Sequence, residues 1–188
     1  MVDSLIEIDK TLALAINGAH LPWLDNVMII ISDKKTWIPL YFAILLGFNK
    51  YFGWKASLLF TLAVILNLVA TDQVSVLFKE GFLRLRPCHN LELNSLLHLP
   101  DGCGGKFSFV SSHASNTMGL AVLISFIFKN KYVSIGMLAF ALLNGYSRIY
   151  LGKHFPIDII GGFVLGVFCA LFFYKLIQLV QSKFDLES

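Results

Sequence analysis

The sequence predicts an all-α, polytopic membrane helix bundle. Hydrophobic residues make up 56% of the 188 residues, whereas charged residues make up only 14%. A typical soluble domain carries about 25% charged residues, and one of this size could not hide so much apolar surface behind so few charges. In addition, charge-free runs recur along the chain, several of them approaching the ~20 residues that a helix needs to cross a hydrocarbon core.

These runs predict five transmembrane helices, near residues 36–50, 54–80, 112–128, 131–149 and 157–180. Several runs are somewhat short for a full span. We therefore expect the polar residues that flank them to lie inside the bundle or at its edges, where a charge is less unfavourable than against lipid.

The first 32 residues are expected to form an interfacial or re-entrant segment. A helix with an apolar stripe suits the membrane interface, and here that stripe consists of Leu5, Ile8, Leu12 and Ile16. Gly18 can end this helix and Pro22 can open the next one. The apolar run 27–31 is too short to span alone, so it either dips into the membrane or extends the first span. Five or six spans are therefore both open.

The chain is expected to be one domain, residues 1–188, in which the segment 1–32 precedes a catalytic bundle over 33–182. The net charge of +3 is modest and scattered, which argues against a nucleic-acid partner. The short loops near Lys50 and Lys129 are basic and lack acidic residues, so they are expected on the cytoplasmic side. The long loop 85–111 then faces outward.

Six ionisable residues near the outer helix ends need an explanation: Lys79, Arg86, His113, Arg148, His154 and Asp158. A single lysine at such a place would extend to the headgroups, but six residues of these types fit that explanation poorly. Imidazoles suit proton or phosphoryl transfer, and arginine can bind a phosphate through two parallel hydrogen bonds.

The spacing of these residues is specific. Lys79 is followed after six residues by Arg86 and Pro87, and the turn Ser111-Ser112-His113 opens a predicted span. Arg148 follows Ser147 and is followed after five residues by His154, with Asp158 four residues further on. Residues i and i+4 share a helix face, so Asp158 can accept a proton from His154 and leave its other ring nitrogen free as a nucleophile.

These three segments resemble the three-part signature of the type 2 phosphatidic acid phosphatase superfamily, which also includes bacterial acid phosphatases and vanadium-dependent haloperoxidases. The resemblance runs from Lys79 to Asp158, with the segments in the family's order. One position departs from the family pattern. The middle segment is typically Pro-Ser-Gly-His and here reads Val-Ser-Ser-His, so Ser112 replaces a glycine whose N–H would approach the phosphate.

The resemblance implies a metal-independent phosphatase that needs no cofactor. His154 would attack phosphorus and form a phosphohistidine, His113 would protonate the leaving oxygen, and Asp158 would orient His154. The phosphate oxygens would be bound by Lys79, Arg86, Ser111, Ser112 and Arg148.

The expected substrate is a phosphomonoester or terminal diphosphate of a membrane lipid in the bilayer. Undecaprenyl diphosphate is favoured, with phosphatidylglycerol phosphate, phosphatidic acid and lipid A phosphates as alternatives. Because the loop 85–111 is expected to face outward, we expect a protein of the bacterial inner membrane whose site faces the periplasm or cell exterior.

Other interpretations stay open at this point. The same cations could serve a non-hydrolytic transporter of anionic lipid or phosphate, or a phosphotransferase that passes the phosphate to an acceptor other than water. A zinc site built from His113, His154 and Asp158 is disfavoured, because three nearby cations would repel the metal. A haloperoxidase is disfavoured because those relatives are soluble.

Two further patterns carry expectations. Cys88 and Cys103 lie in the same outer loop, and we hypothesise a disulfide between them, which requires an oxidising compartment. Gly162 and Gly166 have the small-xxx-small spacing, which we expect to permit close helix packing within the chain. His20, His89 and His98 fit no motif and are interpreted as interfacial.

Overall fold

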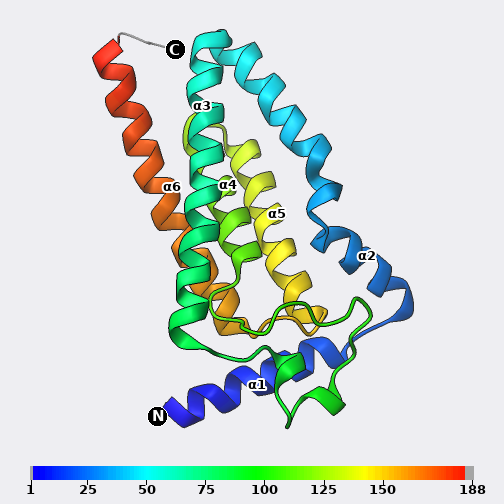
Figure 1. The fold of residues 1–188 in the computed structure, drawn as a ribbon. Coiled ribbons are helices and arrows are strands. Elements are labelled where there is room, and N and C mark those ends of the chain that lie inside the picture. The colour runs from blue at the N-terminus through cyan, green and yellow to red at the C-terminus, as the bar shows by residue number, and fades with distance from the viewer. Residues whose placement is uncertain (1, 185–188) are drawn as a thin grey trace.

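The structure is a computed structural model that describes residues 2–184. Its longest helices stand side by side as a bundle, and the N-terminal helix lies across one end of it (Figure 1). The elements in chain order are α1 (Val2–Gly18), α2 (Pro22–Ser32), η1 (Lys34–Trp37), α3 (Ile38–Phe82), η2 (Pro87–His89), η3 (Asn94–Leu96), α4 (Ser112–Phe128), α5 (Lys131–Tyr150) and α6 (Pro156–Phe184). The predicted all-α class is confirmed for the described residues.

Helix α3 is broken at Gly53, where φ is 74° and ψ is 171°. Glycine adopts this backbone conformation far more readily than any residue with a Cβ. The break divides α3 into two arms that run in opposite directions (Figure 1). The two helices expected near 36–50 and 54–80 are these two arms.

Two helical segments are long and apolar enough to cross a membrane by length and composition, Lys34–Phe82 and Pro156–Lys183. The segments Asp3–Gly18 and Pro22–Ser32 pass the same test only as a pair, and they are bent by 116°. Helix α4 is apolar but has 17 residues. The number of spans, five or six, therefore stays a prediction.

The polar side of α1 faces the protein. Asp9, Ala13 and Asn17 are buried, although two of them are polar. On the remainder of the helix surface, Leu5, Ile8 and Leu12 are 54%, 55% and 47% exposed. An exposed apolar stripe opposite a buried polar one suits a helix that rests on lipid, so the interfacial placement of α1 stays our interpretation.

Helix α4 lies at the centre of the bundle, packed against α3, α5 and α6. Its contact with α6 is very close. A Cβ at Gly162 would lie 2.7 Å from the carbonyl oxygen of Ser111, and one at Gly166 would lie 2.5 Å from that of Ser115. Only glycine fits at such distances, which confirms that the Gly162-x3-Gly166 pair packs helices within the chain.

Candidate active site

Lys79 and Arg86 lie on either side of the end of α3. Leu83 ends the helix in the left-handed conformation, and its N–H bonds to the carbonyl of Lys79. The chain then crosses the outer loop, where the Arg86 guanidinium donates to the carbonyls of Phe107 and Cys103, both at 3.2 Å. The first segment of the signature is therefore fixed by the loop that follows it.

The disulfide between Cys88 and Cys103 ties this loop together, with the two Cα atoms 5.7 Å apart. Cys103 is also the residue whose carbonyl binds Arg86. Both sulfur atoms and the His89 imidazole lie within 4.8 Å of one another, in a geometry that could hold a metal ion. Disulfide sulfurs are not thiolates, however, so this cluster does not have the ligands of a zinc site.

Ser111 is the N-cap of α4, and its hydroxyl accepts from the N–H of Ala114. The N–H of Ser111 itself donates to the carbonyl of Asp158 at 3.0 Å. This bond joins the second and third segments of the signature at the start of α4.

Ser112 is the first residue of α4, in ordinary helical conformation. Its hydroxyl accepts a hydrogen bond from the Lys79 ammonium and lies 2.5 Å from the hydroxyl of Ser75. The serine that replaces the family's glycine therefore contacts the lysine of the first segment, and the backbone path at this position is regular.

Arg148 lies in the last turn of α5, and its guanidinium donates to the hydroxyl of Ser32 at the end of α2. Its carbonyl accepts from the N–H groups of Lys153 and His154, at 3.0 and 3.3 Å. The loop that follows α5 therefore folds back onto the end of that helix. Lys153 pairs with Asp101, which attaches this turn to the outer loop.

His154 and Asp158 meet across the start of α6, not along one helix face as expected, because α6 begins only at Pro156. His154 Nδ1 lies 3.5 Å from Asp158 Oδ2, a distance at the limit of a hydrogen bond. The same oxygen accepts from the N–H of Phe155 at 2.8 Å. Both side chains are buried, with exposed fractions of 1% and 0%.

Burial lowers the pKa of the His154 imidazole to about 4, and the cations Arg86 and Arg148 act in the same direction. The Asp158 carboxylate opposes this effect by favouring the protonated ring. His154 is therefore neutral at pH 7, as a nucleophile requires.

The structure brings the residues of the three segments to one end of the bundle. The charges of Arg86, Arg148 and His154 act electrostatically on His113, and those of Arg86 and Asp158 act on Lys79. His113 is half-buried in the first turn of α4.

Several residues of this region were not singled out from the sequence. Ser75 precedes Lys79 by four residues, so it lies on the same helix face, and that spacing could have indicated it. Ser32 and Asp9 reach the site from the N-terminal helices, and Lys34 acts electrostatically on both Lys79 and His113. Nothing local in the sequence connects these residues to a site more than 40 residues away.

The family to which this chain belongs and the known proteins that it resembles define a class of enzyme, membrane phosphoric ester hydrolases. The family model of the PAP2 superfamily matches residues 54–182 of this chain. The chain belongs to that superfamily, which confirms the resemblance given by the three segments.

The chain is similar over more than nine-tenths of its length to known phosphatases. It is 36% identical to the lipid A 4'-phosphatase of Bacteroides thetaiotaomicron, over 100% of this chain and 85% of that protein. It is 29% identical to the undecaprenyl-diphosphatase BcrC of Bacillus subtilis, over 92% of this chain and 86% of that one. The chain also resembles the crystal structure of the transmembrane PAP2-type phosphatidylglycerolphosphate phosphatase of B. subtilis, with a TM-score of 0.72 and 26% sequence identity. The match covers 96% of this chain and 88% of that one.

Proposed function

We propose that this protein hydrolyses the 4'-phosphate monoester of lipid A through a phosphohistidine on His154. The observation that carries the reaction type is the position of His154, a buried and neutral imidazole beside Asp158, on which the cations Arg86 and Arg148 act. The choice of lipid A over the undecaprenyl diphosphate favoured from the sequence comes from the 36% identity to a lipid A 4'-phosphatase along the full chain.

In this mechanism the phosphate is bound by Lys79, Arg86 and Arg148. Arg148 supports this role, because its buried Nε has no hydrogen-bond partner among the described residues. An unpaired buried donor costs about 1–3 kcal/mol, and a phosphate oxygen would satisfy it. A charge-assisted bond of this kind is among the stronger hydrogen bonds in proteins.

His154 Nε2 would attack phosphorus in line with the departing sugar oxygen, and His113 would protonate that oxygen. Water, deprotonated by His113, would then release phosphate from His154. Asp158 would stabilise the positive charge that the His154 ring carries in the intermediate. Stabilising charge at a preorganised site typically contributes about 10²–10³ in rate per donor.

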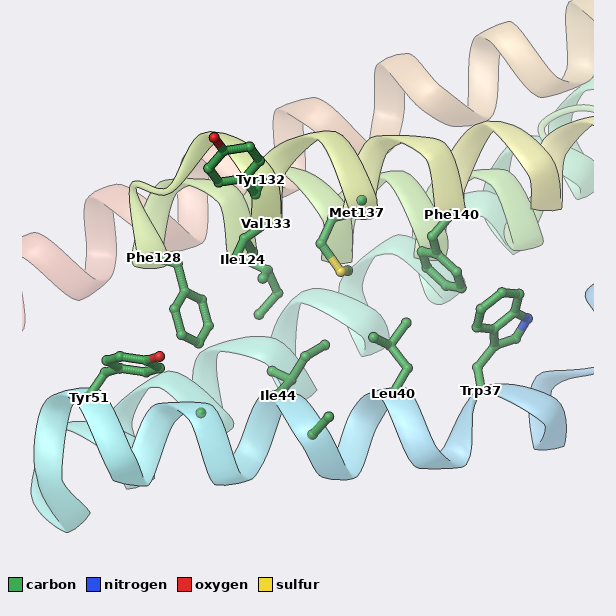
Figure 2. Close-up of a pocket in the computed structure, with 13 residues that line it drawn as sticks. Trp37, Leu40, Ile44, Tyr51, Ile124, Phe128, Tyr132, Val133, Met137 and Phe140 are labelled. Carbon is green, nitrogen blue, oxygen red and sulfur yellow. The ribbon is translucent and has the colours of Figure 1, made fainter.

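An apolar groove of about 440 Å³ runs between the first arm of α3 and helices α4 and α5, and we propose that it takes an acyl chain of the substrate. Figure 2 shows side chains of both walls, among them Leu40, Ile44 and Met137, pointing into the space between them. One end of the groove is Trp37, whose indole N–H donates to the carbonyl of Ile31. Ile31 precedes Ser32, which binds Arg148, so the groove begins close to the phosphate-binding residues.

Phosphate release in detergent, with EDTA present, tests the reaction. Substrates would be lipid A, lipid A that already lacks the 4'-phosphate, undecaprenyl diphosphate and phosphatidylglycerol phosphate. We expect wild type to release phosphate from lipid A and not from the 4'-dephosphorylated form, and His154→Ala to release none. His89→Ala is the matched control, because His89 is exposed and lies outside the three segments.

Three results would contradict the proposal. Unchanged release by His154→Ala would exclude this histidine as nucleophile. Faster release from undecaprenyl diphosphate than from lipid A would replace the substrate with the second candidate, which the similarity to BcrC supports. A non-hydrolytic transporter would release phosphate from no lipid at all.

The groove has its own test. Gly136 lines it and has open space around its Cβ position, so Gly136→Leu is expected to lower the rate on long-chain lipids and leave the rate on a short-chain phosphate ester unchanged. Ile135→Trp adds bulk to the neighbouring residue, which is 64% exposed and lies outside the groove, and should change neither rate. Equal loss on both substrates with Gly136→Leu would contradict the acyl-chain assignment.

A further inference from the structure

We propose that Asp9 and Arg84 are positioning residues for the catalytic pair His154 and Asp158, so that the N-terminal helix is part of the active site. Asp9 lies outside the three segments of the signature, and Arg84 is one of the six unspecified positions between Lys79 and Arg86. The inference rests on the proposed function, because it assigns a role within that reaction.

Asp9 joins α1 to two other parts of the chain. It is 2% exposed, and its Oδ2 lies 2.5 Å from the guanidinium of Arg84. Its Oδ1 accepts from the backbone N–H of Ile157 at 2.9 Å. Ile157 precedes Asp158 in the first turn of α6, where the N–H groups have no partner within the helix. Asp9 therefore fixes the start of the helix that carries Asp158.

Arg84 binds two carboxylates at once. Its Nη1 donates to Asp158 Oδ1 at 2.8 Å, and its Nη2 donates to Asp9 Oδ2. Its guanidinium carbon also lies 4.2 Å from the centre of the Phe155 ring, next to His154. Arginine suits this place because its planar group offers several donors in fixed directions.

The two oxygens of Asp158 consequently have different partners. Oδ1 accepts from Arg84, and Oδ2 accepts from the N–H of Phe155 and faces His154 Nδ1. With Oδ1 fixed, the carboxylate cannot rotate away from the imidazole. Among the described residues, neither Arg84 nor Asp9 forms a hydrogen bond to the imidazole or to the three phosphate-binding cations, so they act through Asp158.

Asp9, Arg84 and Asp158 are also coupled through their charges. Asp9 and Asp158 are buried carboxylates that share one cation, Arg84. Without Arg84 the two buried negative charges would repel each other, and a buried unpaired charge is strongly unfavourable. Proton uptake by Asp158 would relieve this repulsion and weaken its support of the positive His154 ring.

The test uses full-length protein in detergent and the lipid that wild type hydrolyses fastest. Asp9→Asn keeps the Oδ1 acceptor for Ile157 and removes the charge, and Arg84→Gln removes the cation. We expect each to lower kcat about 10- to 100-fold, because a misplacement of about 1 Å at a catalytic group can cost about 100-fold, while KM stays within about two-fold. Arg84→Lys should recover part of kcat, and the double variant should lose less than the product of the two single losses.

Two controls separate positioning from the simple docking of α1. Glu7→Gln changes an exposed acid of α1 that pairs with Lys10, and it should match wild type. Asn17→Ala removes a buried residue of α1 that bonds to the carbonyls of Tyr150 and His98 and does not touch Asp158. It should lower thermal stability with little effect on kcat.

The inference would be overturned if Asp9→Asn and Arg84→Gln kept the kcat of wild type. It would also be overturned if Asn17→Ala lowered kcat as much as they do at the same loss of stability, because docking alone would then explain the effect. Failure of the proposed function gives a different result, since wild type would then release no phosphate.

Discussion

The hydroxyl of Ser112 accepts a hydrogen bond from the ammonium of Lys79, across the contact between α4 and α3. Ser112 stands where the superfamily typically has glycine, and glycine could not make this bond. Ser75 completes the arrangement from the preceding turn of α3, with its hydroxyl 3.4 Å from the same ammonium. In this chain the position of Lys79 thus depends on two serines.

Replacing Ser112 with glycine tests this relationship. Because Ser112 lies in a regular helix, Ser112→Gly should fold, but Lys79 would lose one of its two serine partners. We expect KM for the lipid to rise about three- to ten-fold, in line with ~1 kcal/mol for a hydrogen bond, as measured by phosphate release. Ser75→Ala should have a smaller effect of the same kind. Equal KM values for Ser112→Gly and wild type would show that Lys79 is positioned without the serine.

The buried His154 predicts how stability depends on pH. Its pKa is about 4 in the folded protein and near 6.5 when exposed, so between these values the unfolded chain binds more protons than the folded one. Stability from this group is therefore fully present above pH 6.5 and falls as the pH is lowered from 6.5 towards 4. Thermal melting in detergent across this range should show the decline, and His154→Gln should flatten it. An unchanged slope in His154→Gln would assign the pH dependence to other groups.

The pH dependence of activity should also follow the protonation of His154. His154 must be neutral to attack phosphorus, so on the acidic side we expect kcat/KM to fall only as the pH approaches about 4, well below the ordinary pKa of histidine. Rate measurements on wild type from pH 4 to 8 would test this. An acidic limb near pH 6.5 would contradict the depressed pKa.

Opening the disulfide should loosen the loop that carries Arg86. In the chain-entropy model a bond closing a loop of 15 residues contributes ~3 kcal/mol. Cys88→Ser with Cys103→Ser should therefore lower Tm by several degrees and raise KM, because the carbonyl of Cys103 binds Arg86. Cys169→Ser is the control, since Cys169 is a free cysteine. Full alkylation of Cys88 and Cys103 in unreduced protein would show that the bond does not form.

Lys34 is expected to act as an additional cation of the site. It is exposed at the start of η1, two residues after Ser32, and acts electrostatically on Lys79 and His113. Lys34→Ala should raise KM several-fold at low salt and less at high salt, because exposed charges are screened. Lys35→Ala, one residue further, should leave KM near that of wild type. Equal effects of both variants would indicate only a general loss of positive charge.

The sequence predicted the helices of the bundle well. The expected span 112–128 coincides with α4, and 131–149 ends one residue before α5 does. These boundaries follow from local signals, a hydroxyl-rich turn at one end and charged residues at the other. On either side of Gly53, where α3 reverses direction, the sequence predicts two separate helices, because the basic residues around Gly53 separate two apolar runs.

The site was predicted only as far as the three segments extend. Arg84 is not singled out from the sequence, and its role depends on Asp9, 75 residues earlier, and Asp158, 74 residues later. Such pairings arise from the packing of distant elements and leave no periodicity in the sequence. Asp9 is buried, whereas an acidic residue of an interfacial helix would ordinarily be expected to face solvent.

The link between Asp9 and the start of α6 also bears on how the protein is made. The two groups are 148 residues apart in the chain, so α1 leaves the ribosome long before its partner on α6 exists. Helix α1 can take its final place only after the last helix has entered the bilayer, which makes its docking a late step of biogenesis. Ala13, buried on the same side of α1, offers a way to follow this step. A cysteine introduced there by Ala13→Cys should react with a thiol reagent in ribosome-stalled chains and be protected in the finished protein, whereas protection in the stalled chains would show that α1 docks early.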